Sequence, residues 1–181
     1  MIAYKGFNKD LTCTMGHGTF QYEIGKTYTE EEANCAQNGL HCVEEPIRVL
    51  DWYPDGRYCK VKIEDYHEDG TNKISAKKMT ILSEMDLITL YISEATWMIK
   101  HWDRSYSDRV SKRSAVAEEN GIVIVRGKNP RAKGGMGALL ILLQEAKKSK
   151  KIEVFGVLVV DGEHVLPDKW YHAEGNKYEK G

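Results

Sequence analysis

Residues 58–64, YCKVKIE, alternate apolar and polar side chains without a break. A period of two sends successive side chains to opposite faces of an extended chain, so this stretch predicts a β-strand with Cys59, Val61 and Ile63 on its buried face. Residues 73–82 read as the partner strand, and the polar loop at 67–70 separates the two. We therefore expect a β-hairpin in the N-terminal half.

Two short helices are expected upstream of this hairpin. Thr29 followed by Glu32 has the spacing of a capping box, which predicts a short helix that Gly39 stops. Pro46 fits the first turn of a second short helix at 46–52, because proline is tolerated where a helix begins. A turn signal, Pro-Asp-Gly, follows at 54–56.

The strongest helical pattern lies at about 84–102. Ser83 supplies an N-cap, and apolar side chains then recur at helical spacing as far as Trp102. Beyond this helix come runs of small residues broken by Gly or Asn, which are compatible with a β-solenoid but too few to establish a repeat. Residues 136–144 and 151–160 flank a lysine cluster and predict a second hairpin.

Cysteine and histidine are concentrated near the start of the chain. Thiolates and imidazoles are the preferred ligands of tetrahedral Zn²⁺, so we expect a structural zinc that ties two loops together. The alternative is that these are buried free thiols and loop histidines, since cysteine is among the most buried residue types. The candidate ligands are Cys13, His17, Cys35, His41 and Cys42.

Together these elements predict an α+β fold. It would hold a zinc-tied α/β lobe over 1–82 and, over 83–181, one long central helix followed by an antiparallel β-rich half. Whether the two parts form one continuous domain stays open. The opening residues lack the apolar segment of a signal peptide and no run is long enough to span a bilayer, so we expect a cytoplasmic protein in a bacterial host cell, with no membrane contact.

Charge is unevenly distributed along the chain. The net charge is −6 over residues 1–99, +8 over 100–151 and −3 over 152–181. A basic middle between acidic flanks indicates a polyanion or an acidic protein surface as the partner. The alternative is that the lysines at 147–151 form a solvated turn. The candidate partner-binding residues are Arg104, Arg109, Lys112, Arg113, Lys128, Arg131 and Lys133.

Several segments resemble a family of uncharacterised phage and prophage proteins from Gram-positive bacteria. The opening YKGFNKDLTC at 4–13 carries the most specific similarity, and the other matching segments are at 20–28, 39–46, 114–117, 131–134 and 159–171. Members of the family place a cysteine two residues after the histidine that corresponds to His41, whereas this chain has Val43 there and a cysteine at 42. The identity of a fourth zinc ligand therefore stays open.

The resemblance implies no enzymatic activity. Phage proteins of this size include inhibitors of bacterial immunity, and type II-A anti-CRISPR proteins are similar in scale and origin. We therefore expect a phage-encoded binding protein that inhibits a host defence nuclease, and the expected target is Cas9 or its guide-RNA complex. The alternative is a nucleic-acid-binding accessory protein that uses the basic segment 100–151. No catalytic residues are identified, because neither a P-loop nor a complete nucleophile set is visible.

Overall fold

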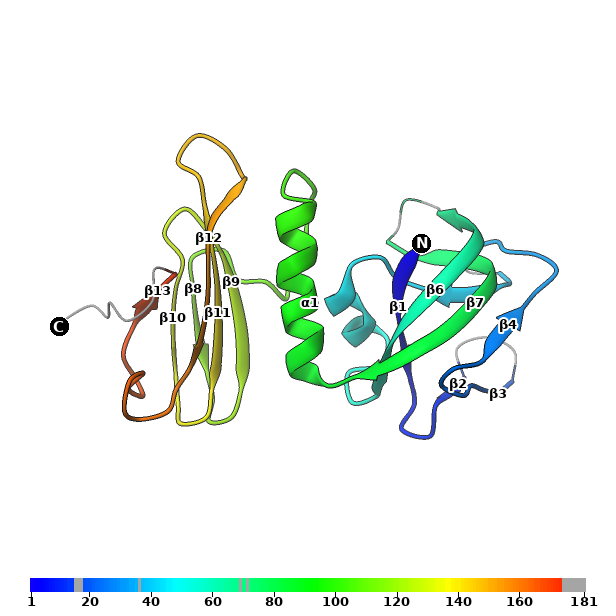
Figure 1. Ribbon diagram of the computed structural model, residues 1–181, viewed down its shortest axis with the longest axis horizontal. Coiled ribbons are helices and arrows are strands. Elements are labelled where there is room, and N and C mark those ends of the chain that lie inside the picture. Colours follow the sequence, from blue (N-terminus) through cyan, green and yellow to red (C-terminus); the bar gives the residue numbers. More distant parts are fainter. Residues whose placement is uncertain (15–17, 36, 69, 71, 174–181) are drawn as a thin grey trace. The chain divides into compact units, whose positions relative to one another are not determined.

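The computed structural model describes residues 1–14, 18–35, 37–68, 70 and 72–173. The chain divides into two compact units, Met1–Leu90 (unit 1) and Tyr91–Gly181 (unit 2), and the division falls within helix α1, Leu87–Lys100 (Figure 1). Among the described residues, no helix is both long enough and apolar enough to cross a membrane.

Unit 1 is built around the hairpin of β6 (Arg57–Glu68) and β7 (Ile74–Met85), which confirms the hairpin predicted from the alternating pattern. Cys59, Val61 and Ile63 are fully buried, as that pattern predicted. The other elements of unit 1 are β1 (Ile2–Phe7), β2 (Thr12–Cys13), β3 (Phe20–Gln21), β4 (Thr27–Thr29), β5 (Leu40–Cys42) and the 3-10 helix η1 (Pro46–Asp51).

The main sheet of unit 1 returns on itself. β1 pairs with β6, β6 with β7, and β7 with β5. Val43, directly after β5, then exchanges backbone hydrogen bonds with Tyr4 of β1 at 2.8 and 2.9 Å. This contact closes the path β1-β6-β7-β5 around a core that includes Phe7, Cys42 and Ile81.

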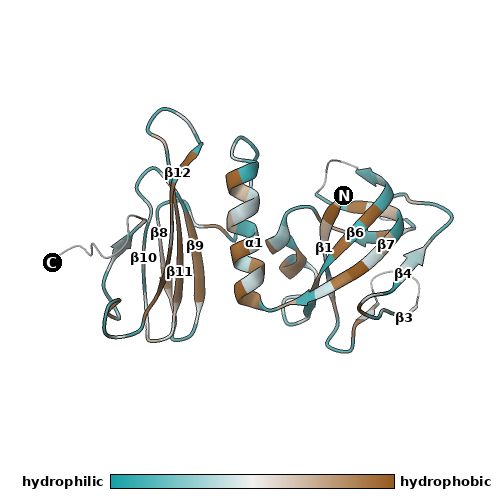
Figure 2. Ribbon diagram, viewed as in Figure 1, coloured by the Kyte–Doolittle hydropathy of each residue, from teal (hydrophilic) through white to brown (hydrophobic). Residues whose placement is uncertain are grey.

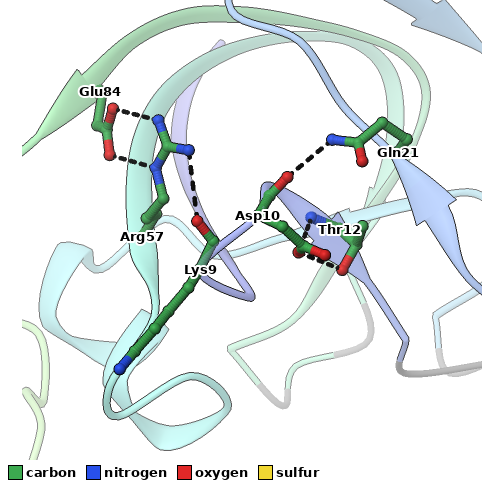
Figure 3. Close-up of polar contacts among 6 residues, drawn as sticks. All are labelled: Lys9, Asp10, Thr12, Gln21, Arg57 and Glu84. Atoms are coloured by element: carbon green, nitrogen blue, oxygen red, sulfur yellow. Dashed lines mark hydrogen bonds and ion pairs between the residues drawn. The ribbon is translucent and has the colours of Figure 1, made fainter.

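The turn between β1 and β2 is fixed by polar contacts (Figure 3). Asp10 accepts hydrogen bonds from the backbone N–H and the hydroxyl of Thr12, at 3.0 and 2.6 Å. Arg57 binds both carboxylate oxygens of Glu84 and also donates to the carbonyl of Lys9. These contacts tie the turn to β6 and β7 and so fix the position of β2, which carries Cys13.

Unit 2 contains two stacked turns of a β-solenoid. β8 (Ser114–Ala117) pairs in parallel with β10 (Arg131–Gly134), and β9 (Ile122–Gly127) pairs in parallel with β11 (Leu139–Glu145). In both ladders the paired residues are 17 positions apart, so residues 114–127 form one coil and 131–145 the next. Antiparallel strands flank the coils: β12 (Ile152–Val159) on β11 and β13 (Tyr171–His172) on β10.

The core of unit 2 lies between the two stacks of strands. It includes Val125, Leu140 and Leu142, each fully buried, and the aromatic ring of Tyr171. Figure 2 shows the hydrophobic residues that run along β9 and β11. The predicted hairpin at 136–144 and 151–160 is confirmed as β11 and β12.

The predicted α+β class was wrong. Among the described residues the protein is mostly β, with 45% strand, 12% helix and two helices, one of them the short η1. The described residues hold no metal-binding group that would tie the N-terminal lobe. In place of the long central helix expected over 84–102, the shorter α1 covers Leu87–Lys100, because β7 runs on through Ser83 and Glu84. The C-terminal half is not purely antiparallel either, since two of its ladders are parallel.

Candidate functional site

Unit 1 contains a pocket of about 280 Å³ between β1, β5 and the segment that follows η1. β1 contributes Lys5, and β5 contributes His41 and Cys42. Trp52 and Tyr53 line the pocket from the end of η1. The pocket therefore joins side chains that are distant in sequence, because the closure of β1 against β5 brings their strands together.

Lys5 is the most unusual residue of this pocket. It lies between Ala3 and Phe7 on the buried face of β1 and is only 5% exposed. Its ammonium donates a hydrogen bond of 2.7 Å to the backbone carbonyl of His41. Burial lowers the pKa of Lys5, and the electrostatic influence of Cys13 and Cys42 opposes that shift in part.

The predicted zinc ligands are only partly brought together. Cys13, His41 and Cys42 all line the pocket, and the Sγ of Cys13 lies 3.0 Å from the Oη of Tyr53. Cys35 instead directs its thiol to backbone carbonyls, those of His67 at 3.2 Å and Lys73 at 3.6 Å. His17 lies outside the described residues.

This arrangement does not fit a tetrahedral zinc ion. No group of three or more His, Cys, Asp or Glu side chains within the described ranges could hold a metal. The zinc-tied lobe is therefore corrected to a small barrel, the closed path β1-β6-β7-β5, held by its own core. Structural zinc stays a prediction that elemental analysis of the purified protein would test.

The four thiols are expected to differ sharply in reactivity. Cys13 and Cys35 are half-buried, whereas Cys42 and Cys59 are buried, with pKa values raised to about 12 and about 11 mainly by desolvation. Because the thiolate is the nucleophile, Cys42 carries roughly a thousandfold fewer thiolates at pH 8 than a thiol of ordinary pKa. Iodoacetamide at pH 8 should therefore label Cys13 and Cys35 first, as followed by peptide mass spectrometry.

Labelling in 6 M guanidinium chloride is the control for this prediction, since unfolding should bring the four rates close together. Labelling of Cys42 in the folded protein at the rate of Cys13 would contradict the buried environment described for β5.

The pocket itself was missed from sequence. Its walls include Trp52, Tyr53 and Lys73, none of which belongs to a recognisable motif. One signal was present at β1, where Lys5 occupies the buried position of the alternating series Ala3, Lys5, Phe7. A lysine on the apolar face of a strand is uncommon, because burying an ammonium is costly without a partner.

The predicted basic residues separate into two groups. Arg104 and Arg109 follow α1, and the guanidinium of Arg104 lies 5.2 Å from the ring centroid of Trp97. The other five lie near one corner of the solenoid, and we refer to them as the basic corner. Arg131 and Lys133 belong to β10, Lys112 and Arg113 directly precede β8, and Lys128 directly follows β9.

Backbone contacts hold the basic corner together. The N–H of Arg126 donates to the carbonyl of Ser111 at 2.8 Å, and the N–H of Arg131 donates to the carbonyl of Arg113 at 3.0 Å. These bonds hold the segment before β8 against the end of β9 and the start of β10. An added Cβ on Gly127 would lie 2.3 Å from the carbonyl oxygen of Lys112, so glycine permits this close approach.

An aromatic ring belongs to the same surface. The guanidinium carbon of Arg131 lies 4.7 Å from the ring centroid of Trp170, and the Nζ of Lys133 lies 5.6 Å from it. Arg131 also pairs with His172 across the ladder of β10 and β13. Among the described residues, Lys112, Arg113, Lys128 and Lys133 form no ion pair. These four side chains therefore present uncompensated positive charge near the aromatic ring of Trp170.

The glutamates of the acidic segment 1–99 differ in their exposure. Glu30, Glu31 and Glu32 are exposed after β4. Glu45 is buried, with 3% exposure, and forms an ion pair of 2.5 Å with Arg48. Glu45 therefore belongs to the interior of unit 1 and is not available to a partner.

Comparison with known proteins gives one match. A family model described as a domain of unknown function, DUF7666, matches residues 1–93, a range that includes the whole pocket of unit 1 and ends within α1. No curated protein and no solved structure matches the chain.

Proposed function

Since the chain belongs to the DUF7666 family, which is described only as a domain of unknown function, we propose a function from the geometry: a non-enzymatic protein that binds single-stranded nucleic acid through the basic corner of unit 2. The observation that carries this proposal is the gathering of five cationic residues at one corner of the solenoid, where two of them, Arg131 and Lys133, lie against the ring of Trp170.

Electrostatics supports this proposal first. Phosphate backbones are recognised mainly by Lys and Arg side chains that neutralise them, and this attraction requires cations that are not already paired. Lys112, Arg113 and Lys128 are exposed and have no ion-pair partner among the described residues.

The second line of support is an aromatic ring on which bases could stack. Proteins that bind single strands combine a positive surface with aromatic rings on which bases stack. Trp170 lies next to Arg131 and Lys133 on the outer side of β10, so an aromatic ring and two cations share one surface. The described part of unit 2 contains no helix on this corner that could enter a DNA groove, so a single strand fits better than a duplex.

Fluorescence anisotropy with labelled 20-nucleotide oligo-dT and oligo-U tests the proposal. Affinity should fall steeply with salt, and neutralising three cations of the corner should reduce the slope of log K against log[salt] by roughly 2, at about 0.7 per phosphate contact. The variant for this test is Lys112→Gln/Arg113→Gln/Lys128→Gln.

The matched control removes the same charge elsewhere in unit 2. Lys147, Lys148 and Lys150 are exposed in the turn between β11 and β12 and are replaced together by Gln. This control should keep the wild-type slope. Equal losses in the two triple variants, or no binding at low salt, would reject the basic corner as the binding surface.

The same surface supports the more specific proposal that the protein inhibits a host defence nuclease. A basic corner suited to a single strand could contact the guide RNA of a Cas9 complex, and the resemblance to phage proteins favours such a target. Cleavage of target DNA by purified Cas9 with its guide, with the protein in tenfold excess, is the direct assay. Unchanged cleavage would reject inhibition and leave nucleic-acid binding to be judged by the anisotropy test.

A further inference from the structure

The pocket of unit 1 is lined by a buried amino group, that of Lys5, which has no carboxylate partner among the described residues. Lys5 is 95% buried. Among the described residues, its Nζ donates a hydrogen bond to one acceptor, the backbone carbonyl of His41. An ammonium carries three donors, so one carbonyl leaves hydrogen-bonding capacity unused. No carboxylate of the described residues forms an ion pair with Lys5. Burial alone favours the neutral amine, so the charged form of Lys5 requires an anion beside it. None of the described carboxylates supplies that anion, which leaves the position open to one from outside the chain.

Other titratable groups around Lys5 do not supply that anion. Desolvation raises the pKa of Cys42 to about 12, so its thiol is neutral at physiological pH. The pKa values of Tyr22 and Tyr53 are also raised well above their usual range, mainly by burial. Cys13 directs its sulfur to the hydroxyl of Tyr53, 3.0 Å away. The ring of Tyr22 gives Lys5 a cation–π contact, with the Nζ 5.2 Å from its centroid.

The other residues that line the pocket indicate what kind of molecule carries the anionic group. Val43, Val49 and Tyr53 form an apolar and aromatic lining, and the pocket volume of about 280 Å³ admits an organic molecule rather than an inorganic ion alone. A second cation lines the pocket: the Nζ of Lys73 lies 3.9 Å from the ring centroid of Trp52. Sites of this kind, mostly apolar with a few placed polar groups, are typical of small-molecule binding.

We propose that the unit 1 pocket binds a small planar organic anion, a carboxylate or a phosphate monoester, whose anionic group is hydrogen-bonded to the Nζ of Lys5 and whose planar body packs among Val43, Val49 and Tyr53. This site is separate from the basic corner, and the proposal does not rest on nucleic-acid binding.

Three aromatic probes test the proposal by isothermal titration calorimetry with the full chain. Benzoate and the neutral benzamide have the same shape and differ in charge, and phenyl phosphate carries the alternative anionic group. One charge-assisted hydrogen bond predicts that benzoate or phenyl phosphate binds at least roughly tenfold tighter than benzamide. Comparison of the two anions identifies which of the two head groups the site prefers.

Lys5→Met keeps most of the volume of the side chain, is one heavy atom shorter, and removes the amino group. The variant should bind benzoate and phenyl phosphate no better than benzamide, and it should melt at or above the wild-type temperature, because a buried polar group with unused donors has been removed. Lys60→Met, an exposed lysine of β6, is the matched control and should keep wild-type selectivity.

Benzamide binding equal to that of both anions in the wild type, or no binding of either anion, would overturn the proposal, and so would Lys5→Met with unchanged selectivity. The wild-type comparison decides the question even if Lys5→Met fails to fold. In that event Lys73→Met, at the second cation of the pocket, should lower the affinity for the anions and leave that for benzamide unchanged.

Discussion

Replacing Arg126 by methionine is expected to destabilise unit 2 by about 3–5 kcal/mol, the usual cost of removing one partner from a buried ion pair. Arg126 lies on β9 and is fully buried. Its Nε donates to the Oε1 of Glu145 at 2.9 Å, and its Nη2 donates to the carbonyls of Trp102 at 2.6 Å and Lys150 at 3.1 Å. Methionine fills much of the volume but leaves Glu145 and both carbonyls without their donor.

Urea unfolding is the measurement, with hydrogen exchange of the β9 and β11 peptides to assign the loss to unit 2. A local readout is needed because two compact units need not unfold together. Lys128→Met, two residues further on and exposed, is the control and should change stability by less than about 0.5 kcal/mol. The double variant Arg126→Met/Glu145→Met should recover part of the loss, since no charge is then left buried alone.

A cost for Arg126→Met as small as that for Lys128→Met would mean that the guanidinium contributes little to the stability of the solenoid. The described contacts argue against this result, because the ring centroid of Tyr106 lies only 4.6 Å from the guanidinium carbon and completes the enclosure of the charge.

Gly39→Ala is expected to cost about 2–4 kcal/mol, from a left-handed backbone combined with overpacking. Gly39 has a φ of +87° and directly precedes β5. A Cβ at this position would lie 2.3 Å from the Oγ of Ser75 and 2.9 Å from the Cα of Ala33. The hydroxyl of Ser75 already donates to the carbonyl of Asn38 at 2.6 Å, so its displacement would also break that bond.

Gly25 provides a matched control for this substitution. It has the same φ of +87°, but nothing lies within 4 Å of its added Cβ. Gly25→Ala should therefore cost only about 1 kcal/mol, the backbone contribution alone. Thermal melting of both variants separates the two effects, and equal melting temperatures would show that the contact around Gly39 relaxes without cost.

The sequence predicted those elements in which local pattern and tertiary structure agree. The β6–β7 hairpin and the β11–β12 hairpin were identified correctly because alternation of apolar residues is itself caused by a sheet with one buried face. The predicted helix after Thr29 was wrong for the opposite reason. Thr29 pairs with Lys78 in the ladder of β4 and β7, and this long-range pairing outweighs the local capping signal.

The parallel ladders of unit 2 could not be established from the sequence. Their partners are 17 residues apart, and the two coils share small or apolar character rather than identical residues. A repeat seen only twice carries little statistical weight, so the small-residue runs were compatible with a solenoid without establishing one.

The candidate site was also predicted in part, because some of its residues are close in sequence and others meet only through the tertiary structure. Proximity in sequence predicted that five Cys and His residues would converge, and three of them do line one pocket. Cys35 turns to backbone carbonyls instead, and Cys42 is buried in the core. What sets the character of the pocket is Lys5, whose neighbours His41 and Tyr53 reach it only through the closure of the barrel.

The spacing of 17 residues between coils has an evolutionary consequence. Each coil meets its neighbour through the same backbone hydrogen bonds, so a duplication of residues 114–130 would extend the stack by one layer of about 4.8 Å without changing the register of any other strand. Within a strand, an insertion or deletion of an odd number of residues would turn inward-facing residues outward, and any other change short of a whole coil would break the 17-residue pairing. Homologues that differ in length across these strands are therefore expected to do so in multiples of one coil.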